Sequence, residues 1–130
     1  MKKVLILGST GSIGKSTIEV IDANKENFLI SGLVARSNEN LLLQQAKRFN
    51  VKNICLTKKK NLEKKYIPES DLEDLIRSDQ VDIVVAAISG VAGLKNILSA
   101  IRSGKRISST MNDQKRVMTP KEALSQGSDW

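Results

Sequence analysis

The fold is decided by the segment Leu7-Gly8-Ser9-Thr10-Gly11-Ser12-Ile13-Gly14, near the start of the chain. The segment begins at the end of an apolar run that starts at Val4, and it leads into a stretch with the spacing of an amphipathic helix. A glycine loop between a first strand and a first helix is typical of α/β folds that bind dinucleotides. The spacing here is G-x-x-G-x-x-G, which is one residue longer in its first gap than G-x-G-x-x-G.

Each glycine of this loop has a predicted role. Gly8 would allow a tight turn, Gly11 a close approach of the backbone to a pyrophosphate, and Gly14 close packing of helix on strand. Amides at the helix N-terminus, with the positive end of the helix dipole, would hold the phosphates. The alternative is a strand-to-helix turn that binds no ligand. Further hydroxyl donors lie at Ser9, Thr10 and Ser12.

Outward from the loop, short apolar runs alternate with longer segments of helical period. The predicted strands are 3–7, 29–35, 53–56, 83–88 and 106–108, and the predicted helices are 12–23, 38–49, 70–78 and 92–102. Fully apolar strands suit a sheet that helices cover on both faces. The predicted class is therefore α/β, a doubly wound, Rossmann-like parallel sheet of about five strands, closed by a C-terminal helix.

Two details of these helices follow from residue spacing. Ser70 and Glu73 have the spacing of a capping box, in which a hydroxyl and a carboxylate satisfy amides at a helix start. The first predicted helix places four residues on the face expected to pack on the sheet. These residues are Ile13, Thr17, Val20 and Ile21.

The end of the second predicted strand indicates which dinucleotide would bind. A site that prefers NAD usually has Asp or Glu there, whereas this chain has Arg36-Ser37-Asn38. A guanidinium and a hydroxyl suit a 2′-phosphate, so NADP(H) is favoured over NAD(H). Two alternatives stay open: Arg36 as a solvated surface charge, and Asn38 as the N-cap of the next helix.

Small residues follow the fourth predicted strand. Ala87 and Gly90 would let a ribose or a nicotinamide ring approach the backbone closely. The alternative for Gly90 is that it only shapes a strand-to-helix turn. The segment is therefore a second candidate contact for the same dinucleotide.

Composition excludes several kinds of chemistry. The 130 residues include no histidine, which rules out Ser-His-Asp and Cys-His nucleophile systems and histidine-ligated zinc. The single cysteine, Cys55, excludes a disulfide scaffold, and its apolar strand predicts a buried, inert thiol. The formal charge is +7, but few aromatic residues accompany the lysines at 58–60, so nucleic-acid binding is not expected. No apolar run is long enough to span a membrane, and the expected location is the cytoplasm.

The segments 6–14, 33–35, 86–94 and 100–105 together resemble the N-terminal NADPH-binding domain of the 1-deoxy-D-xylulose 5-phosphate reductoisomerase family, over residues 1–107. That family consists of oxidoreductases of non-mevalonate isoprenoid biosynthesis. The resemblance implies that Thr10, Gly11, Ser12 and Ile13 hold the NADPH pyrophosphate. It also implies that 36–38 face the 2′-phosphate, where the family more often has Gly-Lys-Asn.

The family also uses Mg or Mn, held by carboxylates of a downstream catalytic domain. Nothing in this chain matches those carboxylates, so the resemblance implies a cofactor-binding domain with no catalytic residues that is inactive alone. Two alternatives stay open: an enzyme completed by another chain, and a recombined scaffold that binds no cofactor. A short fifth strand would also leave a sheet edge at which two copies can pair as a homodimer.

The last segment, 112–130, resembles a C-terminal segment of the orotidine 5′-phosphate decarboxylase family. Thr119 as N-cap, Pro120 at the first helical position and Gly127 as the stop predict a helix in it. The resemblance implies a chimera, with an NADPH-binding domain at 1–107 and a helical extension of different origin at 108–130.

Overall fold

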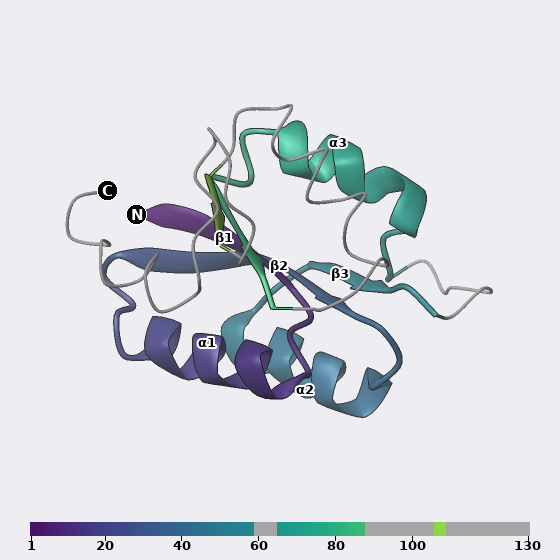
Figure 1. Ribbon diagram of the computed structural model, residues 1–130, viewed down its shortest axis with the longest axis horizontal. Coiled ribbons are helices and arrows are strands. Elements are labelled where there is room, and N and C mark those ends of the chain that lie inside the picture. The colour runs from purple at the N-terminus through teal and green to yellow at the C-terminus, as the bar shows by residue number, and fades with distance from the viewer. Residues whose placement is uncertain (59–64, 88–105, 109–130) are drawn as a thin grey trace.

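The computed structural model describes residues 1–58, 65–87 and 106–108 of the chain (Figure 1). The predicted helix at 92–102, the predicted closing helix and Gly90 lie outside these residues. In the described part of the chain, no helix has both the length and the apolar character needed to cross a membrane.

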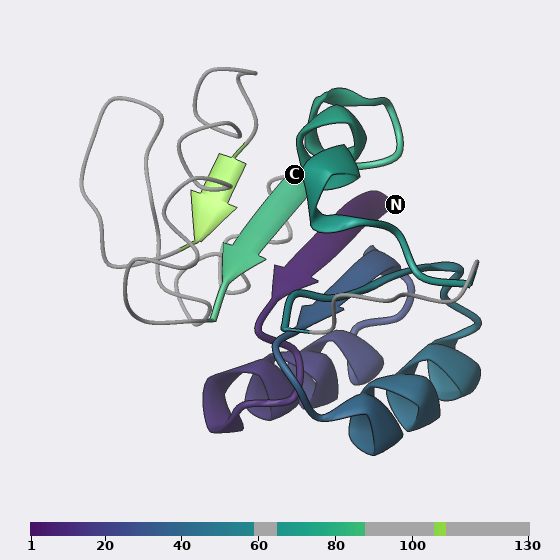
Figure 2. The ribbon, with the colours of Figure 1, turned by 90° about the vertical axis from the view of Figure 1, so that its right-hand side faces the viewer.

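The centre of the molecule is a parallel sheet with the strand order β3-β2-β1-β4-β5 (Figure 2). Its strands are β1 (Lys2–Leu7), β2 (Phe28–Ala35), β3 (Asn53–Leu56), β4 (Ile83–Ala86) and β5 (Arg106–Ser108). Every neighbouring pair is parallel. The chain builds outward from β1 to β3 and then crosses to the other side of β1 to form β4. The gap between β1 and β4 is therefore the switch point, beside which ligands of open parallel sheets bind.

Helices cover both faces of this sheet, which confirms the predicted doubly wound α/β class. The helices α1 (Ser12–Asp22) and α2 (Glu39–Phe49) lie on one face, and α3 (Leu72–Arg77) lies on the other (Figures 1 and 2). In β1, Val4 and Ile6 belong to the core under α1 and α2, whereas Leu5 and Leu7 belong to the core under α3. Because both faces of β1 are buried, its sequence is apolar at successive positions.

The inward face of α1 differs from the prediction. Its buried residues are Gly14, Thr17, Ile18 and Ile21, while Ile13 is 55% exposed and Val20 is 41% exposed. The prediction that Ile13 and Val20 pack on the sheet was wrong. Gly14 packs directly on the glycine loop and so sets the rotation of the helix, which places Ile18 rather than Ile13 over the core.

The predicted capping box of the third helix was also wrong. The helix α3 begins only at Leu72, after a 3-10 turn, η1 (Glu69–Asp71), and no side chain caps either element. Glu73 forms an ion pair with Arg77 one turn later, at 2.9 Å. A short 3-10 turn after Pro68 therefore starts this element in place of the box, as is common at helix N-termini.

Candidate nucleotide-binding site

The glycine loop forms a tight turn at the carboxyl end of β1. Gly8 has a φ of 87°, a left-handed conformation that favours glycine, so its predicted role in the turn is confirmed. The amides of Gly8 and Ser9 both donate to the carbonyl oxygen of Val34, at 2.7 and 3.1 Å. The loop is therefore attached to the end of β2 as well as to β1.

Gly14 and Gly11 have different surroundings. A Cβ on Gly14 would lie 2.0 Å from the carbonyl oxygen of Gly8 and 2.8 Å from backbone atoms of Ser9, so close packing of helix on loop requires glycine here. A Cβ on Gly11 would lie 3.7 Å from that Gly8 oxygen, which is an ordinary contact. Because Gly11 is exposed, the absence of its side chain leaves space on the outer side of the loop.

The N-terminus of α1 has the properties of an anion site. Gly11 is its N-cap, no side chain caps it, and its first turn contains no acidic residue. The positive end of the helix dipole therefore has no acidic residue beside it in the first turn. Thr10 is half-buried, and Ser12 and Ile13 are exposed at the same place.

The segment after β2 lies at the same edge of the sheet. Arg36, Ser37 and Asn38 are all exposed. The side chain of Asn38 accepts a hydrogen bond from the amide of Leu41 at 3.2 Å, which confirms that it is the N-cap of α2. The amide of Lys58 donates to the carbonyl of Arg36 at 2.9 Å, so the first of the lysines at 58–60 lies beside this segment.

Ala87 joins the same edge from β4. Its amide donates to the carbonyl of Leu7 at 2.8 Å, directly before the glycine loop. The structure thus brings the described site residues of three strand ends, β1, β2 and β4, to one edge beside the switch point. Gly90, predicted for the same site, lies outside the described residues.

Gln45 contacts the loop and was missed by the sequence reasoning. It is 7% exposed on α2, and its Nε2 donates to the carbonyl of Ser9 at 2.9 Å. The signal in the sequence was its position, because Gln45 shares the inward face of the helix with Leu42 and Ala46. A polar residue on such a face needs a specific partner.

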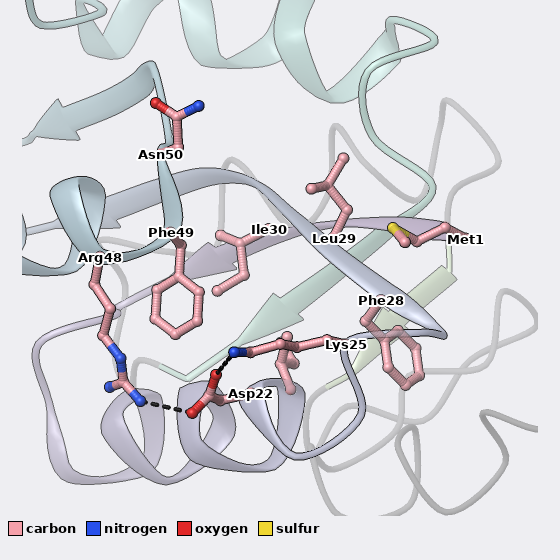
Figure 3. Close-up of a pocket in the computed structure, with 10 residues that line it drawn as sticks. Met1, Asp22, Lys25, Phe28, Leu29, Ile30, Arg48, Phe49 and Asn50 are labelled. Atoms are coloured by element: carbon pink, nitrogen blue, oxygen red, sulfur yellow. Dashed lines mark hydrogen bonds and ion pairs between the residues drawn. The ribbon is translucent and has the colours of Figure 1, made fainter.

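A hollow lies at the opposite, amino edge of the sheet (Figure 3). Phe28 and Phe49 contribute to its wall, and Arg48 and Lys25 both point to Asp22. The ion pairs from Asp22 measure 2.7 Å to Arg48 and 3.1 Å to Lys25, and the hydrogen bond from Lys25 is the main cause that lowers the pKa of Asp22. Since these charges pair with one another, the hollow does not resemble a phosphate site.

The described residues include neither a candidate metal site nor a reactive cysteine. No group of three or more possible metal ligands occurs among the described residues. Cys55 is fully buried, and burial raises the pKa of its thiol to about 12 from an ordinary 9.0, with the Glu69 carboxylate as a second cause. The prediction of a buried thiol is confirmed, and the raised pKa makes it a poor nucleophile.

Known proteins resemble most of this chain. The relative from Wigglesworthia glossinidia brevipalpis, a 1-deoxy-D-xylulose 5-phosphate reductoisomerase, is 39% identical over 82% of the chain. The reductoisomerase from Thermoanaerobacter sp. is 41% identical over the same share. The chain spans about 30% of the length of each of these curated relatives.

Solved structures agree with the sequence relatives. A reductoisomerase in complex with magnesium matches 84% of this chain and 30% of its own, with a TM-score of 0.75 and 31% identity. The reductoisomerase from Zymomonas mobilis in complex with NADPH matches 81% of this chain and 30% of its own, with a TM-score of 0.69 and 34% identity. A levoglucosan dehydrogenase at 18% identity and a TM-score of 0.55 shares the fold alone.

The model of one protein family matches residues 4–114, and its description is 1-deoxy-D-xylulose 5-phosphate reductoisomerase. This match extends beyond residue 107, where the resemblance was predicted to end, and includes the first residues of the segment interpreted as foreign. The predicted family is thereby confirmed over most of the chain, whereas the comparisons do not support the chimera. This chain belongs to the 1-deoxy-D-xylulose 5-phosphate reductoisomerase family.

Proposed function

We propose that this chain is the NADPH-binding part of a reductoisomerase of isoprenoid biosynthesis. One observation carries the proposal: the N-terminus of α1, without a side-chain cap, lies behind a glycine loop at the same sheet edge as Arg36. Such an edge offers backbone donors for one phosphate group and a guanidinium for another. The NADPH complex of the Zymomonas relative supports the same ligand.

The residues at this edge fit the phosphates of NADPH. The pyrophosphate would lie over Thr10, Gly11, Ser12 and Ile13, where exposed backbone meets the helix dipole and Gly11 has no side chain in the way. The 2′-phosphate would lie against Arg36, Ser37 and Asn38. Ala87 and Gly90 would border the ribose and nicotinamide. These assignments use only neutral or positively charged groups.

When bound, NADPH supplies a hydride. The residues of this chain would bind the NADPH and orient it. No set of ligands for magnesium or manganese is present among the described residues, so no metal step is assigned to them. We therefore expect the chain alone to reduce no deoxyxylulose phosphate. Measurable consumption of NADPH with that substrate would contradict this expectation.

Calorimetric titration of the chain with NADPH and NADH tests the proposal. NADPH should bind at least about tenfold more tightly, because only it carries the 2′-phosphate that Arg36 can contact. Absent binding of both cofactors would instead favour the alternative of a scaffold without a ligand. Equal binding of both would contradict the assignment of the 2′-phosphate site.

Three further proposals concern the C-terminal segment, the pairing of two copies and the location of the protein. The segment 108–130 is proposed as a helical extension, although the family model includes its first residues. Pairing of two copies at the edge strand β5 is proposed and is testable by sedimentation. Location in the cytoplasm, without nucleic acid as a partner, follows from the lone cysteine and the few aromatic residues.

A further inference from the structure

We propose that Gln45 is a positioning residue that sets the direction of a phosphate-binding amide in the glycine loop. The inference rests on the proposed function, because it concerns how the loop is held ready for the pyrophosphate. Gln45 lies on α2, and the loop precedes α1, so the contact joins segments 36 positions apart in the sequence. Gln45 is 7% exposed and Ser9 is fully buried.

The backbone of Ser9 is held from three sides. Its amide donates to Val34 at 3.1 Å, its Cα and carbonyl carbon pack against Gly14, and its carbonyl oxygen accepts from Gln45 at 2.9 Å. The last of these contacts is made by a side chain, which can be replaced without changing the backbone of the loop. A mutation at Gln45 can therefore remove this contact and leave the other two in place.

Planarity of the peptide bond connects this contact to the ligand. The carbonyl of Ser9 and the amide of Thr10 belong to one peptide unit, and the chain contains no cis peptide bond in its described part. In a trans peptide the C=O and N–H point in opposite directions. Since Gln45 directs the Ser9 carbonyl toward the protein interior, the Thr10 amide must point away from it, toward the outer side of the loop where the pyrophosphate is proposed.

The chemistry of the side chain supports a specific task. The face of α2 that carries Gln45 otherwise buries Leu42 and Ala46, so an apolar residue would pack there at lower desolvation cost. The Oε1 of Gln45 has no hydrogen-bond partner among the described residues, and neither has the hydroxyl of Ser9. Within the described part of the chain, the one hydrogen bond of this buried amide is therefore the bond from its Nε2 to the loop.

The substitution Gln45→Met tests this inference in the full chain. Methionine keeps the length and the helix propensity of the side chain but cannot donate to Ser9. The matched control is Gln44→Met, which makes the same change at the neighbouring exposed position of α2. Gln45→Asn is a second variant, since its amide is too short to reach the loop.

Two ligands separate positioning from a general loss of structure. Gln45→Met and Gln45→Asn should each weaken NADPH binding about tenfold, whereas adenosine 2′-monophosphate, which lacks the pyrophosphate, should bind as it does to the wild type. Gln44→Met should leave both affinities unchanged. Equal losses for the two ligands, or an unchanged NADPH affinity, would overturn the inference.

A measurement without ligand distinguishes this inference from the proposed function. In amide NMR spectra of the free chain, Gln45→Met should shift the Thr10 resonance and speed its exchange with solvent, and Gln44→Met should do neither. An unchanged Thr10 amide would overturn the positioning role even if NADPH binds. Failure of the wild type to bind NADPH, together with a shifted Thr10 amide, would instead contradict the proposed function alone.

Discussion

The carbonyl oxygen of Gly8 occupies the space that a side chain on Gly14 would need, with only 2.0 Å between that oxygen and the position of a Cβ. The first glycine of the loop therefore lies directly against the third. Because Gly8 is also held to Val34 by its amide, the loop cannot move aside without breaking its attachment to β2. The third glycine is thus required by the fold, whether or not a ligand binds.

Replacing the second and third glycines should separate folding from binding. Gly14→Ala should destabilise the chain by about 1–3 kcal/mol or more, because the new methyl group meets backbone atoms. Gly11→Ala should cost below about 1 kcal/mol, since its Cβ has space and its φ of −77° suits alanine, but it should weaken NADPH binding. Urea unfolding and calorimetry measure the two effects. Similar losses of stability for both variants would contradict the prediction that the fold requires glycine at position 14 but not at position 11.

Arg36 is the basis for a prediction about cofactor preference. Arg36→Asp should shift preference from NADPH toward NADH, because a carboxylate repels the 2′-phosphate and can accept from the ribose hydroxyls. Lys52→Asp is the matched control, since it makes the same change of charge at an exposed residue before β3, at the amino edge of the sheet. Titrations of both variants with both cofactors measure the ratio of affinities. The same shift in both variants would show that only net charge matters.

Much of this fold follows from local pattern. The predicted bounds of β3 and β5 agree with the structure, and β1, β2 and α1 differ by single residues at their ends. The turn at Gly8 and the close packing at Gly14 were predictable, because each role follows from the position of the glycine between the strand and the helix. The ligand contacts of the loop remain predictions, because they depend on atoms of the ligand and not on contacts within the chain.

The missed features depend on contacts between distant segments. The pairing of β1 with β2 shifts register between Val4 and Leu5, so Ser31 is an extra residue in β2. As a result Phe28 and Ile30 share one core with Leu33 and Ala35, which strict alternation would place on opposite faces. The Gln45 contact is similar in kind. Spacing within α2 places Gln45 on the inward face, but neither its partner in the loop nor the register shift could be predicted from one element alone.

Cys55 should make stability depend on alkaline pH. In the unfolded chain the thiol ionises near its ordinary pKa of 9.0, but in the folded chain burial raises that pKa to about 12. Both states keep the proton below pH 9, where stability is fully present, and stability then falls as pH rises toward 12 because only the unfolded thiol loses its proton.

The size of this effect can be isolated with Cys55→Ala. Between about pH 8 and about pH 10, the wild type should lose about 1 kcal/mol of its free energy of unfolding relative to the variant. Other groups titrate alike in both proteins and cancel in the comparison. The free energies come from urea unfolding at each pH. A difference between the two proteins that stays constant with pH would contradict the buried, protonated thiol.

Asn38 combines a structural contact with a proposed ligand contact, and two substitutions separate them. Asn38→Ala removes the acceptor for the Leu41 amide and should cost about 1 kcal/mol of stability. Asn38→Asp keeps that acceptor and adds a negative charge at the start of α2, so the stability should be retained or slightly raised. The same charge would lie beside the 2′-phosphate, so Asn38→Asp should weaken NADPH binding several-fold more than NADH binding. If Asn38→Asp instead weakens both cofactors equally, Asn38 is only a helix cap and the 2′-phosphate lies elsewhere.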